Sequence, residues 1–244
     1  MIKLLWCIIA VCTISSCFGQ PDQKHIDMVK EAYSHFNNSE GKSQNTIYYN
    51  YSIVTSFIEG DEVKKDSSGG NMVIRGEKMI FKSGDNVIFC DANKTININK
   101  VTKIVSVAPT ANTEGNTMFD KQQKSQEMLF KEATNSSLKD VKFKNRDAIK
   151  IVFKISENGQ KLYGTENLVY ILDSKSGELM YSGVFYVKGK IKKSAKLYIN
   201  ELNFNAENKA SMLNGDFTAK IIGANGKLAG EYIGYKLIDY RKKQ

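Results

Sequence analysis

Apolar residues recur at helical spacing near the start of the chain. These positions are Ile26, Val29, Tyr33 and Phe36. Their intervals of three or four residues place them on one face of a helix. Asp22 stands where an N-cap belongs, and a polar run from Asn37 that leads to a glycine ends the pattern. The sequence therefore predicts an amphipathic helix with one apolar stripe.

From residue 46 onward the period changes to alternation. Apolar and polar residues alternate from Thr95 to Asn99, and a longer run from Ala148 to Ile155 has the same period in its apolar positions. Segments rich in Gly, Asn, Asp and Ser interrupt such runs at residues 59–61, 67–70, 83–85, 91–93, 157–159, 174–177 and 225–226. Short strands joined by tight polar turns predict a large antiparallel sheet that curls.

One helical segment interrupts the strands in the middle of the chain. It extends from Met118 to Ala133, after a loop at residues 109–115, and its apolar content is concentrated in residues 128–130. Two helices beside an antiparallel sheet, with no helix between most strands, make an α+β arrangement. No linker rich in Pro or Ser and no internal repeat divides the chain. We therefore predict a single domain over residues 20–244.

The first residues predict an export signal. Lys3 is followed by an apolar run over residues 4–11 and a small polar region, as in secretory signal peptides. The run is shorter than the roughly 20 apolar residues that span a bilayer. Two cleavage sites compete: residues 14–17 resemble a lipobox, which removes residues 1–16 and acylates Cys17, and residues 17–19 resemble a site cut before Gln20, which removes residues 1–19. Acylation would anchor the protein on a membrane, and the other cleavage would release it.

The chain is basic, with a formal net charge of +9 that falls to +8 when Lys3 leaves with the signal. Basic chains raise the question of nucleic acid. Export and the scattering of the lysines along strands argue against nucleic-acid binding. We therefore expect no nucleic-acid partner. The densest cluster consists of Lys188, Lys190, Lys192, Lys193 and Lys196. A solvated hairpin turn and contact with an anionic membrane surface are the two interpretations of this cluster.

The chain is poor in the convergent polar groups that catalysis or metal binding needs. Its two histidines, His25 and His35, lie ten positions apart on the first predicted helix. They are therefore nearly three turns from each other and cannot share a metal ion. The sequence contains no Gly-rich phosphate loop and no nucleophile elbow. We expect no catalytic residue, no metal and no cofactor, and we do not expect an enzyme.

Several segments, in their order along the chain, resemble the periplasmic outer-membrane lipoprotein-carrier family (LolA-like). The family pattern is a glycine, a short strand ending in Arg, a second strand, a turn and a strand leading to an Asp, with three adjacent strands in the second half. The corresponding segments are residues 69–81, 84–91, 169–173, 177–186 and 197–204. The export signal and both predicted helices also stand where that family has them. The resemblance covers most of the chain after the signal.

The resemblance implies an incomplete, half-open antiparallel β-barrel, with helices that cover its concave face and form a lid over an apolar cavity. It also implies that Arg75, which matches the arginine of the family pattern, latches this lid to the sheet. The residues that we expect to line the cavity are Val73, Met79, Phe81, Ile96, Ile98, Tyr33 and Phe36. A strand arginine that reaches water and ordinary core packing are the alternatives for Arg75 and for the apolar residues.

Signal and resemblance together favour a soluble carrier in the periplasm of a Gram-negative bacterium. It would bind the acyl chains of lipoproteins or lipids reversibly, and we expect a monomer. Two alternatives stay open. With an acylated Cys17, the protein would be a lipoprotein acceptor or lipid-binding lipoprotein tethered to the outer membrane. A non-catalytic sensor or interaction module of the envelope would use the same cavity to detect cargo and signal through a protein partner.

Overall fold

The structure, a computed structural model, describes residues 20–37, 45–110, 118–223 and 225–242, without the side chains of residues 35–37, 118–124 and 242. The helices are α1 Gln23–Asn37, α2 Met118–Lys131, α3 Glu157–Tyr163, α4 Phe217–Ile221 and the 3-10 helices η1 Glu207–Leu213, η2 Gly230–Tyr232 and η3 Tyr240–Lys242. The strands are β1 Ile47–Glu59, β2 Glu62–Arg75, β3 Lys78–Ser83, β4 Asn86–Cys90, β5 Lys94–Asn99, β6 Ile104–Pro109, β7 Ala133–Phe143, β8 Arg146–Ile155, β9 Thr165–Asp173, β10 Leu179–Tyr186, β11 Lys192–Asn203 and β12 Lys236–Asp239.

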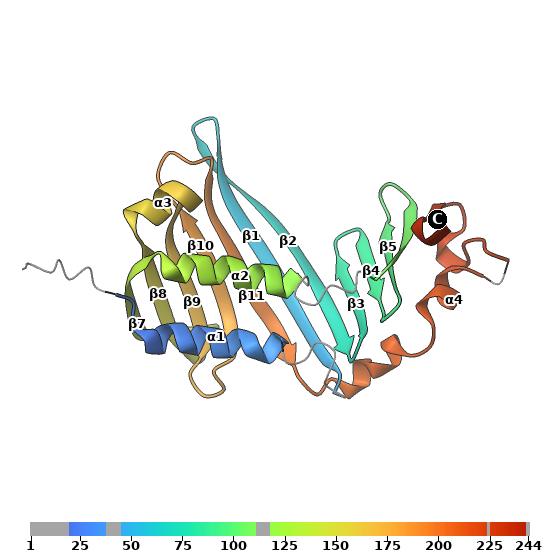
Figure 1. Ribbon diagram of the computed structural model, residues 1–244, viewed down its shortest axis with the longest axis horizontal. Helices are drawn as coiled ribbons and strands as arrows, with labels where there is room; N and C mark the ends of the chain where they lie inside the picture. Colours follow the sequence, from blue (N-terminus) through green and yellow to red (C-terminus); the bar gives the residue numbers. More distant parts are fainter. Residues whose placement is uncertain (1–19, 38–44, 111–117, 224, 243–244) are drawn as a thin grey trace, which may run out of the picture.

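The strands form one sheet in the order β12-β6-β5-β4-β3-β2-β1-β11-β10-β9-β8-β7. Its pairs are antiparallel except that of β12 with β6, which is parallel. Within the described residues β7 and β12 have one neighbour each, so the sheet does not close on itself. The helices α1 and α2 lie side by side across β7 to β11 (Figure 1). The predicted fold class, an α+β half-open barrel with helices on one face, is confirmed.

The sheet carries a hydrophobic core on each face. We call the face under α1 and α2 the inner face and the opposite one the outer face. On the inner face, α1 and α2 pack against β1, β2 and β8 to β11. On the outer face of β2 to β6, a second core is closed by η1, α4 and η2, which we call the C-terminal cover. The cover was not predicted from the sequence.

Both predicted helices are confirmed. The backbone N–H of Lys24 donates to Asp22 Oδ1 at 2.9 Å, so Asp22 caps the start of α1 as its sequence position indicates. The second helix begins at Met118 as predicted and ends at Lys131, two residues earlier than expected. The polar segments at 59–61, 83–85, 91–93 and 174–177 do join strands.

Two of the predicted turns are wrong. β2 continues through residues 67–70, which stay paired in register with residues 51–54 of β1. At Gly70 the Tyr51 side chain covers the strand, so a Cβ there would lie 2.9 Å from Tyr51 Oη. Residues 157–159 are the first turn of α3, whose N-cap Ser156 accepts a hydrogen bond from Gly159 N at 2.9 Å.

Candidate functional site

The inner face is built by alternation along the central strands. In β1, Tyr49, Tyr51 and Ile53 pack toward the inner core, while the residues between them face outward. β11 pairs with β1 so that Leu197 lies opposite Ile53 and Ile199 opposite Tyr51. Paired residues share a face, so these five side chains form one continuous apolar surface.

The part of the inner face that lies under α1 and α2 is closed. Ile151, Phe153, Leu168 and Tyr170 of β8 and β9 are between 0% and 2% exposed. Phe130 of α2 contacts them, with its ring centroid 5.0 Å from that of Phe153. Burial, together with the neighbouring Tyr33, raises the pKa of the Tyr170 phenol well above its ordinary value. This region is an ordinary packed core.

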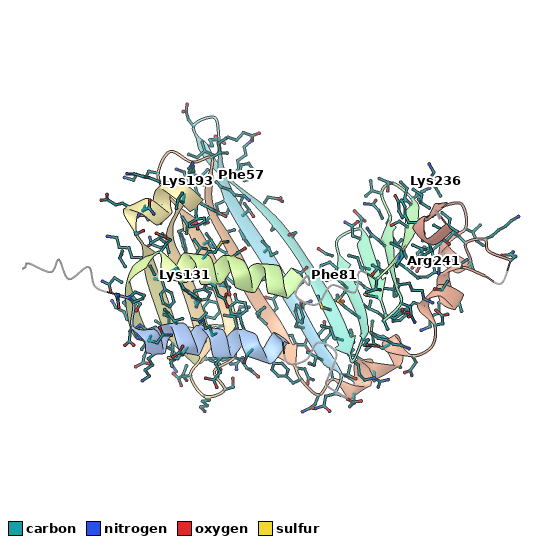
Figure 2. All side chains as sticks on the ribbon, in the orientation of Figure 1. Phe57, Phe81, Lys131, Lys193, Lys236 and Arg241 are labelled. Atoms are coloured by element: carbon teal, nitrogen blue, oxygen red, sulfur yellow. The ribbon has the colours of Figure 1, made fainter. Side chains whose placement is uncertain are left out.

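The other half of the inner face is apolar but only half-buried. It lies on β1, β3, β10 and β11, and Figure 2 labels one of its residues, Phe81, to the side of the two helices. We call these residues the inner-face strip: Ile53, Phe81, Val184, Leu197 and Ile199. Met79, also half-buried, continues the strip on β3. The sheet thus presents partly exposed apolar side chains beside a closed core.

Tyr51 joins the strip to the closed core. Its ring stacks on Phe81, with the centroids 6.2 Å apart and the planes 15° apart. Burial raises the pKa of the Tyr51 phenol, and a hydrogen bond with the Ser83 side chain opposes this shift. The phenol therefore stays neutral at physiological pH, and its ring contributes apolar surface.

The seven residues predicted to line one cavity do not lie together. Met79 and Phe81 belong to the inner face. Val73, Ile96 and Ile98 are each 0% exposed on the outer face, where they pack with Phe217 and the rest of the C-terminal cover. A shift of one position along a strand changes the face, and alternation alone does not tell the two faces apart.

The other two residues of the predicted cavity, Tyr33 and Phe36, belong to α1. Tyr33 of α1 is 7% exposed and packs edge-on against Tyr170, with the ring centroids 6.3 Å apart, so it belongs to the closed core. Phe36 belongs to α1, but its side chain lies outside the described residues. Cys17, the predicted acylation site, lies outside them too.

The structure places Arg75 on the side of the C-terminal cover. Its Nη2 donates to Asn214 Oδ1 at 3.4 Å, just after η1. On the neighbouring strand, Lys78 Nζ donates to Gly215 O at 2.9 Å, beside the same loop. Since Ile74 packs on the inner face, the next residue along β2 points outward. The geometry therefore connects Arg75 to the C-terminal cover. The latch prediction instead requires a contact between Arg75 and α1 or α2.

Sequence reasoning missed most of the strip. Ile53, Leu197 and Ile199 stand in alternating runs that could have been selected by period alone. What marks them is their pairing, because β1 and β11 are about 150 residues apart in the chain and become neighbours only in the sheet. The signal in the sequence that could have located part of the strip is the alternation of Tyr49, Tyr51 and Ile53.

The chemistry of the inner face is that of apolar contact. In the part of the chain that the structure describes, no group of three or more His, Cys, Asp or Glu is arranged to hold a metal ion. None of the described helices is both long and apolar enough to cross a membrane. The partly exposed apolar side chains of the strip suit a ligand that needs burial more than directional bonds.

No family model matches this chain, and no curated protein does. Solved structures do match. One is an uncharacterized conserved protein from Thermus thermophilus, with a TM-score of 0.40 and 9% identity, and the match covers 89% of this chain and 98% of that one. A putative outer membrane lipoprotein-sorting protein domain from Vibrio parahaemolyticus matches with a TM-score of 0.30 and 13% identity, over 78% of this chain and 98% of that one.

A LolA superfamily protein from Nitrosomonas europaea matches with a TM-score of 0.29 and 7% identity, over 79% of this chain and 98% of that one. The solved structures that match thus include a lipoprotein-sorting domain and a protein of the LolA superfamily.

Proposed function

We propose that this chain binds acyl chains of lipoproteins or lipids on the inner-face strip, as a carrier or binding protein of the bacterial envelope. One observation carries the proposal. The inner face is fully buried under α1 and α2 at Ile151 and Phe153, yet half-buried at Ile53, Leu197 and Phe81 on the neighbouring strands. An apolar chain laid along these strands would complete the burial that the helices leave unfinished.

Apolar contact alone can hold such a ligand. Each methylene that leaves water contributes about 0.8 kcal/mol, so a long acyl chain binds without hydrogen bonds or charges from the protein. The strip offers aliphatic side chains and the stacked rings of Tyr51 and Phe81. Binding of this kind is non-directional and leaves the ligand chemically unchanged, which suits a protein that must release its cargo again.

The predicted signal supports a location for this function in the periplasm of a Gram-negative bacterium. A chain that begins at Gln20 would carry cargo as a soluble shuttle. A chain that begins with an acylated Cys17 would receive or hold cargo at the outer membrane, because two or more acyl chains give stable anchoring. The mass of the N-terminal peptide from protein secreted by a bacterial host separates the two: acylation adds the mass of a diacylglyceryl group and a fatty acid to Cys17.

Native mass spectrometry of residues 20–244, purified from a bacterial periplasm, tests the binding itself. This segment contains every described element. We expect non-covalent adducts of lipid mass that a fluorescent fatty acid displaces. A clean protein mass together with no uptake of the fatty acid would mean that the strip is filled by its own side chains, and the carrier proposal would fail. The sensor hypothesis would then be the one to pursue, through a search for a protein partner.

A further inference from the structure

Three segments meet at one end of the sheet. They are α3, the turn at residues 187–191 between β10 and β11, and the hairpin between β1 and β2, which Figure 1 shows together beside the label of α3 and above it. Val187 N donates to Gly164 O at 3.0 Å, which ties the turn to the end of α3. Ile58 N donates to Ile191 O at 2.8 Å, which ties the turn to β1. The three segments therefore form one surface.

Large apolar side chains are exposed on this surface. Ile191 at the end of the turn is 74% exposed, and Leu162 and Tyr163 at the end of α3 are 64% and 40% exposed. Val63, on the hairpin, is 61% exposed. Single exposed apolar residues are common on soluble proteins, but several on adjoining segments mark an interaction site.

Lysines surround the exposed apolar residues. Lys188 and Lys190 are exposed in the turn, Lys192 is exposed at the start of β11, and Lys161 is exposed on α3. Residues 187–193 contain no acid. No ion pair joins these four lysines to an acid among the described residues, whereas Lys64 on the hairpin pairs with Glu59. Glu59, Asp61 and Glu62 lie at the tip of the hairpin and bound the cationic surface on that side.

We propose that this end, formed by α3 and the turn at 187–191, docks on an anionic lipid bilayer. Each lysine near an anionic membrane surface contributes about 1 kcal/mol, and the effect is lost beyond a Debye length. Ile191 and Leu162 would enter the boundary between headgroups and acyl chains, and Tyr163 is the kind of amphipathic ring found there. A nucleic acid would attract the lysines but would leave the exposed apolar side chains without a comparable environment.

The proposed docking surface lies at the end of the strands that carry the inner-face strip. The turn and the hairpin terminate β1, β10 and β11, the strands that carry most of the inner-face strip. Phe57, half-buried and on the same face of β1 as Ile53, pairs with Lys192 at this end, and Figure 2 labels Phe57 beside Lys193. A bilayer held here lies in line with the strip. The docking stands on exposure and charge, and it does not depend on acyl binding.

Co-sedimentation with vesicles tests the docking, using residues 20–244. We expect binding to vesicles that contain phosphatidylglycerol, much weaker binding to phosphatidylcholine alone, and loss of binding at high salt. The combined change Lys188→Gln, Lys190→Gln and Lys192→Gln should weaken binding at least about tenfold. Ile191→Asp should weaken it by a similar factor. All of these side chains are exposed, so the fold should survive, which circular dichroism and a thermal melt would verify.

The matched control is Ile233→Asp, because Ile233 is also 74% exposed but lies in the C-terminal segment, on the far side of the molecule from α3. Equal losses in Ile191→Asp and Ile233→Asp would overturn the proposal, as would binding that ignores the lipid charge or the absence of binding. Fatty-acid uptake by the triple lysine variant should equal that of the wild type. Failed docking with intact uptake would reject the docking alone, and failed uptake with intact docking would reject only the carrier function.

Discussion

The ring of Tyr51 on β1 lies almost parallel to the ring of Phe81 on β3, across the intervening strand β2, with the centroids 6.2 Å apart. Gly70 makes this contact possible. It pairs with Tyr51 in the sheet, and without a side chain it leaves the surface of β2 open to the tyrosine ring. The glycine that looked like a turn residue in the sequence is therefore part of the inner face.

Gly70→Ala should disrupt this arrangement. A Cβ at Gly70 would overlap the backbone oxygen of Lys82 and crowd the Tyr51 hydroxyl, and the backbone oxygen belongs to a paired strand that cannot easily move. We expect a loss of about 1–3 kcal/mol in the free energy of unfolding, measured by urea denaturation. Gly69→Ala is the comparison variant, because its Cβ would meet the Tyr51 backbone oxygen at 3.0 Å, a less severe contact than the overlap with the Lys82 backbone oxygen at Gly70, so it should cost clearly less stability. Equal losses in the two variants would refute the role of Gly70.

Adjacent residues on β1 provide a matched test of the strip. Ile53 lies on the inner face and Val54 on the outer face, and both are half-buried aliphatic residues. Ile53→Asn should weaken binding of a fluorescent fatty acid roughly tenfold, because it removes one apolar contact with the chain and adds a polar group. Val54→Asn should leave the affinity unchanged. If both variants bind as the wild type does, the acyl chain does not lie on the strip.

The sequence predicted the α+β class, both long helices and the alternation of the strands, because these features depend on local periodicity. It could not assign faces. Val73 and Phe81 looked equivalent in the sequence, yet one lies under the C-terminal cover and the other on the inner face. The cover itself has only short helices, such as α4 with its five residues, and segments of that length leave almost no periodic signal. Only its packing on Ile96 and Ile98 reveals its role.

Substitutions of Arg75 and Phe217 distinguish a lid latch from a structural contact with the C-terminal cover. Arg75 makes an exposed hydrogen bond to Asn214, so Arg75→Leu should change stability by less than about 1 kcal/mol and leave the release rate of a bound fatty acid unchanged. Phe217→Ala should cost about 3–5 kcal/mol, because the ring is 1% exposed in the outer core. Stopped-flow release and urea denaturation measure the two effects. Slower release from Arg75→Leu would support the latch hypothesis.

Asp173 makes the stability of the sheet depend on pH. Its Oδ1 accepts hydrogen bonds from the backbone of Ser176 at 2.9 Å and of Lys175 at 3.0 Å, and its Oδ2 pairs with Arg146. These contacts, led by the bond from Ser176, lower the pKa of Asp173 below its ordinary value. The unfolded chain, with a pKa of about 3.9, therefore binds a proton more readily than the folded one. The stability from this carboxylate is present above that pKa and is lost as the pH falls through the lower folded value.

Asp173→Asn should therefore lower the free energy of unfolding at neutral pH, by on the order of 1 kcal/mol, because the amide keeps the shape but loses the charge that faces Arg146. The difference from the wild type should shrink as the pH falls below about 4, where the wild-type carboxylate is also being protonated. Urea denaturation of both proteins over this pH range measures the difference. Asp140→Asn, at an exposed position of β7, is the control and should follow the wild type at every pH. A gap between Asp173→Asn and the wild type that stays constant down to acid pH would show that Asp173 stabilises the turn through its shape and not through its charge.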